Sequence, residues 1–128
     1  MVQRVRDIML PEITTIDGLT KVSETLEIMK EKDVQSVLIR PRNEDDVYGL
    51  ITLRDIARKV IAPRKRLSEV HAYEIMSKPV LMINPNMPTS YAARFLTNFN
   101  ISWAPVMEND KLVGVVSLSG IVMNCDEL

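Results

Sequence analysis

The chain is poor in the residues that build covalent, metal or aromatic sites. Its 128 residues include one cysteine, one histidine and 5% aromatic side chains. Cys125 has no second cysteine with which to form an internal disulfide, so a reducing compartment is expected. His71 has no second ligand for a zinc site, and the sequence offers no Cys–His or acid–base constellation. We therefore predict that the protein is not an enzyme and requires no metal or cofactor.

A strong charge of one sign and long apolar runs are also absent. The 16 Lys and Arg residues balance 17 Asp and Glu residues, for a formal net charge of −1. This balance makes nucleic-acid binding a poor prediction, because such binding needs a strong positive field. No apolar run approaches the roughly 20 residues of a membrane span, and Met1–Asp7 lacks the apolar core of a secretory signal. We expect a cytoplasmic protein with no membrane partner.

The sequence does contain an imperfect internal duplication. Gly49–Ile56 (GLITLRDI) returns as Gly114–Ile121 (GVVSLSGI), and Asp7-Ile8-Met9 returns as Glu74-Ile75-Met76. The offset is 67 residues for the second pair and 65 for the first. The two extra residues of the first copy fall in the polar stretch Arg40–Asp46, where a hairpin loop tolerates changes in length. Self-similarity at a fixed period indicates a repeated structural unit.

Each copy is predicted to form a strand, a helix, two strands and a helix. In the first copy these are the β-branched stretch Ile13–Ile16, the amphipathic stretch Lys21–Lys32, the hairpin Val34–Ile39 with Val47–Ile51, and a helix that Thr52 opens and that ends before Pro63. The matching segments of the second copy are Val80–Ile83, Thr89–Phe99, Ile101–Val106, Leu112–Val116 and Ser117–Met123. Neither copy alone is expected to bury enough apolar surface, so we expect the two to pack together through their sheets.

These motifs resemble a tandem pair of CBS (cystathionine-β-synthase) domains, often called a Bateman module. The resemblance rests on the Asp-Ile-Met opening, on Ile13–Ile16, on Ile101–Val106 and above all on Gly49–Asp55. It implies an α+β fold of two β-α-β-β-α CBS repeats packed through their sheets as an intramolecular pair. Repeat 1 would span 4–62 and repeat 2 would span 73–124, joined by a linker at 63–72. It also implies a regulatory module that binds an adenine nucleotide of the AMP, ADP or ATP type in the cleft between the repeats, and that signals energy or metabolite state to a separate effector protein.

Thr52-Leu-Arg-Asp55 is the candidate ligand site. The first N–H groups of a helix lack internal partners and attract anions. A carboxylate there can accept both ribose hydroxyls, while Thr52 and Arg54 can meet phosphate oxygens. The resemblance assigns the ribose to Asp55, with Thr52 in support, and the adenine to strands of the other repeat. The adenine residues carried over are Val80, Met82, Ile83, Ile101, Trp103, Ala104 and Pro105.

The same four residues have a purely structural interpretation. Thr-x-x-Asp is also the capping-box pattern, which stabilises a helix by about 1 kcal/mol with no ligand. One carboxylate can serve both roles, so both interpretations stay open. Trp103 likewise has several predicted roles: stacking on a purine, filling the cleft, or a dimer contact.

The second copy is predicted to hold the weaker cleft, because Gly120 stands where the first copy has Asp55. We expect this cleft to be empty or to accept a different group, leaving one functional site per chain. The residues predicted to line it are Thr14, Thr15, Ser36, Val37, Ser117 and Ser119.

Two surfaces remain to be interpreted. The basic residues of 58–66 (Arg58, Lys59, Arg64, Lys65 and Arg66) predict a solvated face, with phosphate or nucleic-acid contacts as alternatives. A homodimer is predicted because the resemblance implies one and because a helix face such as Ile56–Val60 would need covering. The alternatives to an adenine-nucleotide sensor are an S-adenosylmethionine or NAD binder and a structural dimerisation protein whose clefts are filled by its own side chains.

Overall fold

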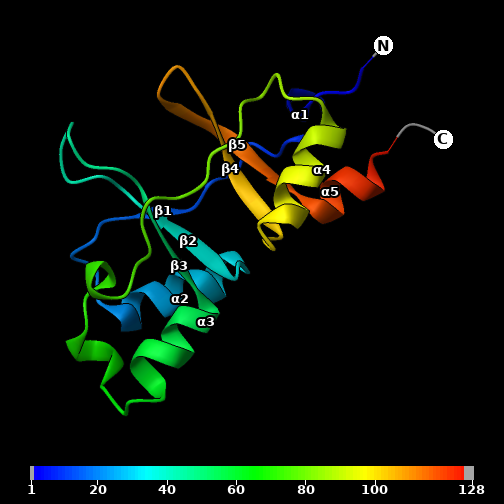
Figure 1. Ribbon diagram of the computed structural model, residues 1–128. Coiled ribbons are helices and arrows are strands. Elements are labelled where there is room, and N and C mark those ends of the chain that lie inside the picture. The colour runs from blue at the N-terminus through cyan, green and yellow to red at the C-terminus, as the bar shows by residue number, and fades with distance from the viewer. Residues whose placement is uncertain (1, 126–128) are drawn as a thin grey trace. The chain divides into compact units, whose positions relative to one another are not determined.

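The structure, a computed structural model, describes residues 2–125 and has the predicted α+β fold. The chain folds into two compact units that are not simply its two halves. Thr14–Val80 forms one, which we call the central unit (Figure 1). Residues 2–13 join residues 81–125 to form the other, which we call the terminal unit.

The central unit is built around a three-stranded sheet. Its strands are β1 (Thr15–Ile16), β2 (Ser36–Ile39) and β3 (Gly49–Thr52). β1 pairs in parallel with β2, and β2 pairs antiparallel with β3, so that Ser36 lies opposite Thr52. The predicted hairpin is therefore confirmed.

Two helical segments complete the core of the central unit. α2 (Val22–Lys32) buries Val22, Thr25 and Met29, which recur at helical spacing, and it ends at Asp33 in the left-handed conformation. α3 (Leu53–Ile56) begins after β3 and continues as the π-helix η1 (Ala57–Ile61). The prediction that Ile56 and Val60 would form an exposed face is wrong, because their exposed fractions are 2% and 0%. Both side chains pack into the core of their own unit.

The stretch after η1 returns to the start of α2. It contains two short 3-10 helices, η2 (Leu67–Glu69) and η3 (Ala72–Glu74). The Val22 N–H donates to the Val70 carbonyl, and Val70, Ala72 and Ile75 enter the same core as Met29. His71 opens η3 by donating its N–H to Glu74 Oε2 at 2.8 Å, and this bond lowers the pKa of the Glu74 carboxyl. The sequence predicted a linker over 63–72, yet Val70 and Ala72 of that stretch are part of the core.

The terminal unit is built around a hairpin. Its elements are α1 (Val5–Ile8), α4 (Thr89–Asn98), β4 (Trp103–Glu108), β5 (Lys111–Ser117) and α5 (Leu118–Met123). Asn109 and Asp110 join β4 to β5 with φ of 52° and 63°, the left-handed pair that suits a tight hairpin turn. α4 and α5 lie side by side against this hairpin (Figure 1).

The strand predicted at Val80–Ile83 does not form. Only Ile83 pairs, through an isolated parallel bridge to Val106. Pro79 and Pro85 flank the stretch, and proline has no N–H with which to continue a ladder.

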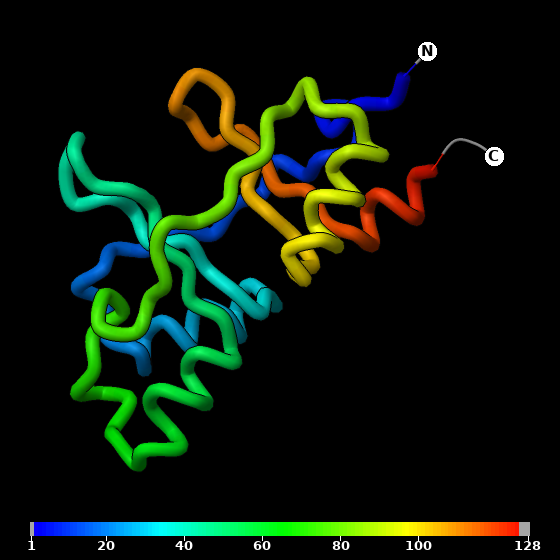
Figure 2. The backbone as a smooth tube through the Cα atoms, viewed as in Figure 1, coloured from blue at the N-terminus to red at the C-terminus, as the bar shows by residue number. Residues whose placement is uncertain are grey.

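Each repeat lends its first residues to the unit that holds the other repeat's sheet. We call Arg4–Leu10 and His71–Ser77 the leading segments; they correspond at the 67-residue offset. Leu10 pairs with Val115 of β5, and Ser77 pairs with Leu50 of β3. Figure 2 shows the blue N-terminal segment beside the orange strand of the terminal unit. Repeats defined by sequence and units defined by packing therefore do not coincide.

Glycines make these close approaches possible. A Cβ on Gly114 would lie 2.6 Å from the Leu10 carbonyl oxygen, and one on Gly49 would lie 2.6 Å from Met76 Sδ. The close neighbour of Gly49 thus belongs to the leading segment of the second repeat. Within residues 2–125, none of the helices combines the length and apolarity that crossing a bilayer requires.

Candidate functional site at the start of α3

Thr52 and Asp55 form a reciprocal capping box. The Asp55 N–H donates to Thr52 Oγ1 at 3.1 Å, and the Thr52 N–H donates to Asp55 Oδ2 at 2.9 Å. The Thr52 hydroxyl also donates to Oδ2, at 3.1 Å. The capping interpretation of Thr-x-x-Asp is thus confirmed, and it occupies one of the two carboxylate oxygens.

The other oxygen, Asp55 Oδ1, faces two cations. Lys59 Nζ lies 3.5 Å from it and Arg58 Nη2 lies 3.8 Å from it. Lys59 Nζ also donates to the Ile75 carbonyl at 2.8 Å. The Asp55 side chain is only 11% exposed and that of Lys59 is 32% exposed. A carboxylate this enclosed needs a nearby cation to offset its lost hydration.

Lys59 was not predicted as part of this site, although the sequence holds a signal for it. Asp55 corresponds to Gly120 at the 65-residue offset, and Lys59 corresponds to Asn124 at the same offset. The acid and its cation are therefore replaced together in the second copy. Asn124 instead donates its side-chain amide to the Gly120 carbonyl at 2.8 Å.

Residues predicted for both clefts meet at one end of the central sheet. Ser36, assigned to the weaker cleft, pairs directly with Thr52. Arg54 is exposed, whereas Val37 is fully buried in the core. Thr15 Oγ1 accepts a hydrogen bond from Arg40 at 3.1 Å, and Thr14 precedes it in the chain.

In the terminal unit too, residues predicted for the two different clefts lie next to each other. Ser117 lies opposite Trp103 in the β4–β5 pairing, and Ser117 Oγ accepts from the Gly120 N–H at 3.0 Å to cap α5. Ser119 Oγ lies 3.1 Å from Ser117 Oγ. Gly120 has no side chain and so supplies no acid to complete this cap. The second copy therefore retains the hydroxyl of the motif and lacks its carboxylate.

The residues carried over for adenine differ in their exposure. Ile83 and Ala104 are 1% exposed within the core of the terminal unit, and Pro105 is buried. Met82, Ile101 and Trp103 are half-buried in that unit, and so is Val80 in the central unit. Within this carried-over set, Met82, Ile101 and Trp103 are thus the side chains of the terminal unit that retain accessible apolar surface for a ring.

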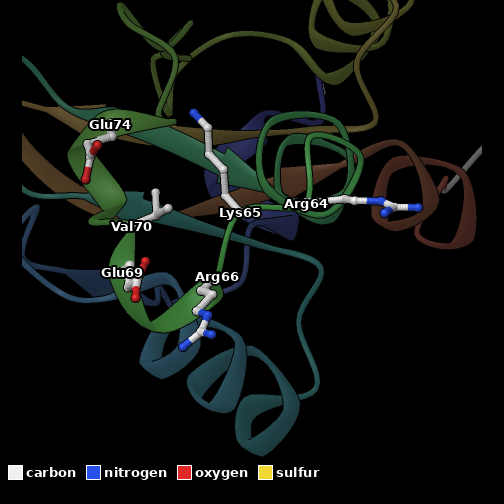
Figure 3. Close-up of a pocket in the computed structure, with 6 residues that line it drawn as sticks. All are labelled: Arg64, Lys65, Arg66, Glu69, Val70 and Glu74. Atoms are coloured by element: carbon white, nitrogen blue, oxygen red, sulfur yellow. The ribbon is translucent and has the colours of Figure 1, made fainter.

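The described residues line hollows on the individual units. One of about 430 Å³ is lined by Arg64, Lys65, Arg66, Glu69, Val70 and Glu74. In Figure 3, Lys65 and Arg66 extend to opposite sides of the chain and Arg64 points away from both. Divergent cations interleaved with two carboxylates do not make a pocket for a single anion, which favours the solvated-face interpretation.

The second hollow lies beside the start of α5. It measures about 300 Å³ and is lined by Thr97, Asn100, Ile101, Ser102 and Leu118. Ile101 is the one residue that it shares with the predicted adenine set. Among residues 2–125, no group of three or more His, Cys, Asp or Glu side chains is arranged to hold a metal ion.

Both copies of the internal repeat match one family of known proteins. Residues 5–62 and 72–126 each match the family model for the CBS domain. The chain belongs to the CBS-domain family. It is 34% identical over 95 residues to the protein MK0525 of Methanopyrus kandleri, covering 73% of this chain and about half (48%) of that relative.

Solved CBS structures share the fold of the whole chain. The hexameric CBS-CP12 protein from bloom-forming cyanobacteria is 36% identical with a TM-score of 0.89, over 98% of this chain and 70% of that one. The CBS domain pair of protein MJ0100, solved with 5′-methylthioadenosine and S-adenosyl-L-methionine, has a TM-score of 0.78 over 96% of this chain and 95% of its own. At 24% identity the latter similarity concerns the fold alone. The tandem CBS arrangement predicted from the sequence is confirmed, and such tandem modules are regulatory.

Proposed function

We propose that this CBS pair is a non-catalytic sensor in the cytoplasm that binds one adenine nucleotide of the AMP, ADP or ATP type. The observation that carries the proposal is the carboxylate of Asp55, held at a helix start with one oxygen fixed by the cap. Oδ1, which the cap leaves unused, is the acceptor we assign to the ribose hydroxyls. The adenosyl ligands of the MJ0100 pair support this class of ligand.

The remaining parts of the ligand follow from the chemistry of the other residues. Thr52 supports the ribose end, and the exposed guanidinium of Arg54 suits a phosphate, which it can bind through two parallel hydrogen bonds. We assign the adenine to Met82, Ile101 and Trp103 of the second repeat, together with Val80, Ile83, Ala104 and Pro105. A ligand that binds one arrangement of the repeats more tightly shifts the population toward it, and this shift would reach a separate effector protein.

Thermal unfolding of the purified protein tests this proposal. AMP, ADP, ATP, NAD and S-adenosylmethionine would each be added at a series of concentrations. A ligand at a hundred times its Kd stabilises the folded state by about 2.7 kcal/mol, which raises the Tm by several degrees for a chain of this size. An adenine nucleotide should give the largest rise; a largest rise with S-adenosylmethionine or NAD would assign the site to that ligand.

A second function is favoured by one observation. Lys59 and Arg58 already neutralise Asp55, so the site would be filled by the protein itself in a purely structural interaction module. That alternative predicts no rise in Tm with any member of the series.

We also propose that the protein forms a homodimer. Leu53 and Ile61 remain 42% and 57% exposed on α3 and η1, and Val122 and Met123 remain 69% and 84% exposed on α5. Apolar side chains left open on helices favour association. Sedimentation at micromolar concentration should give the mass of two chains; the mass of one chain would contradict the dimer.

A further inference from the structure

We propose that Lys59 is a positioning residue for the ligand, holding Asp55 so that Oδ1 accepts a ribose 2′-hydroxyl. This inference rests on the proposed function. It assigns a role to a cation that is neither in the Thr-x-x-Asp motif nor among the residues carried over from the family resemblance.

The first support is that Lys59 is itself held in place. Its Nζ donates to the Ile75 carbonyl at 2.8 Å, and its side chain is only 32% exposed. Ile75 lies in the leading segment of the second repeat and is 3% exposed, so this carbonyl is a fixed acceptor. A lysine anchored in this way has lost most of the freedom that makes surface ion pairs weak. Its charge therefore stays beside Asp55.

The second support is that the two oxygens of Asp55 have different partners. Oδ2 accepts from both the backbone and the hydroxyl of Thr52, whereas the contacts of Oδ1 within residues 2–125 are the longer ion pairs at 3.5 and 3.8 Å. Oδ1 thus has cationic neighbours without the short hydrogen bonds that would saturate it. An incoming hydroxyl can donate to Oδ1 while the charge stays compensated.

The third support is the internal comparison that the duplication provides. α5 keeps the hydroxyl cap but has Gly120 and Asn124 where the first copy has Asp55 and Lys59. The first copy also has the π-helical turn Ala57–Ile61, whereas α5 is a plain α-helix. π-Helical turns are rare and often accompany functional sites. The acid, its cation and the irregular turn thus occur together in one copy.

Calorimetric titration with AMP and with 2′-deoxy-AMP tests the role of Lys59. The quantity compared is the Kd for 2′-deoxy-AMP divided by the Kd for AMP, because this ratio isolates recognition of the 2′-hydroxyl. In the wild-type protein AMP should bind more tightly. Lys59→Met should lower the ratio by about tenfold, the effect of losing one hydrogen bond to a charged group. Lys59→Arg keeps the positive charge, so it should keep most of the wild-type ratio.

Two further variants make the result decisive. Lys65→Met removes an exposed cation of the nearby hollow and should leave the ratio unchanged. Lys59→Gln keeps a donor without the charge and should behave like Lys59→Met, so it replaces that variant if melting shows that Lys59→Met is unfolded.

The outcomes separate this inference from the function on which it depends. If Lys59→Met weakens both ligands equally, Lys59 is structural and the inference is wrong while nucleotide binding stands. If AMP binds more tightly to Lys59→Met, the ion pair blocks the site and the inference is also wrong. If the wild-type protein binds AMP without preferring it to 2′-deoxy-AMP, Oδ1 does not read the 2′-hydroxyl. If the wild-type protein binds neither ligand, both the inference and the proposed function fail.

Discussion

At the scale of single residues, the two oxygens of Asp55 have different surroundings. Oδ2 completes the cap of α3, and Oδ1 faces Lys59 and Arg58. The Thr-x-x-Asp spacing predicted the cap, and the family resemblance assigned the ribose to the same carboxylate. It did not predict Lys59, because a lysine one helical turn after an acid is common on solvated helices and has no distinctive spacing.

The two glycines that precede the capped helices provide a residue-scale prediction. Gly114→Ala should reduce the free energy of unfolding by about 1–3 kcal/mol, because the new methyl group meets a backbone carbonyl that cannot easily move. Gly49→Ala should cost less, because its closest neighbour is the sulfur of the flexible Met76 side chain. Urea denaturation of the two variants measures the difference. A larger decrease in the free energy of unfolding for Gly49→Ala than for Gly114→Ala would show that Met76 is as rigid as the backbone.

At the scale of elements, α3 and α5 are duplicated helices with unequal first turns. α3 has a full capping box, whereas α5 has only the acceptor half, through Ser117 Oγ. This difference separates the copy that we propose to bind the nucleotide from the one predicted to hold the weaker cleft.

Restoring the missing carboxylate should stabilise the second copy. In Gly120→Asp the new side chain can accept the Ser117 N–H and complete a capping box, and a carboxylate also favours the first turn of a helix. The nearest obstacle to a Cβ at this position is Ser117 Oγ at 3.1 Å. We expect the free energy of unfolding to rise by about 0.5–1 kcal/mol. Gly120→Asn is the control for charge, and a fall in stability with Gly120→Asp would contradict the inferred cap.

The sequence predicted most elements because their patterns are local. The hairpin strands, the amphipathic α2 and the helix that Thr52 opens were all recognised from spacing and from the repeat. The prediction of a strand at Val80–Ile83 was wrong. The repeat pattern suggested this strand, but the flanking prolines prevent a continuous ladder. The core role of Val70 and Ala72 was missed, because a short apolar stretch beside a charged run resembles a linker.

At the scale of the whole molecule, the exchanged leading segments could not be predicted from the repeat. A repeat fixes which residues correspond and leaves open which copy they pack against. Leu10 pairs with Val115 and Ser77 pairs with Leu50 through isolated bridges, so each sheet gains a paired residue from the other repeat. One consequence is that the repeat and the folded unit should differ in stability when isolated.

Two fragments of similar length test this consequence. The fragment 14–80 retains the whole core that includes Met29, Val60 and Ile75, whereas 4–62 lacks Val70, Ala72 and Ile75. We expect 14–80 to unfold cooperatively on heating and 4–62 to show a broad transition or none, because so small a core tolerates little loss. Circular dichroism melts of both fragments measure this. A sharper transition for 4–62 would contradict the exchange.

Nucleotide binding at Asp55 is tested most directly by calorimetric titration of AMP into the wild-type protein and into Asp55→Asn, with melting curves to verify that both are folded. We expect saturable binding to the wild-type protein at about one AMP per chain, and at least tenfold weaker binding to Asp55→Asn, because a neutral amide is a poorer acceptor for the ribose hydroxyls. Equal affinity of the two proteins, or no binding to the wild type, would contradict it.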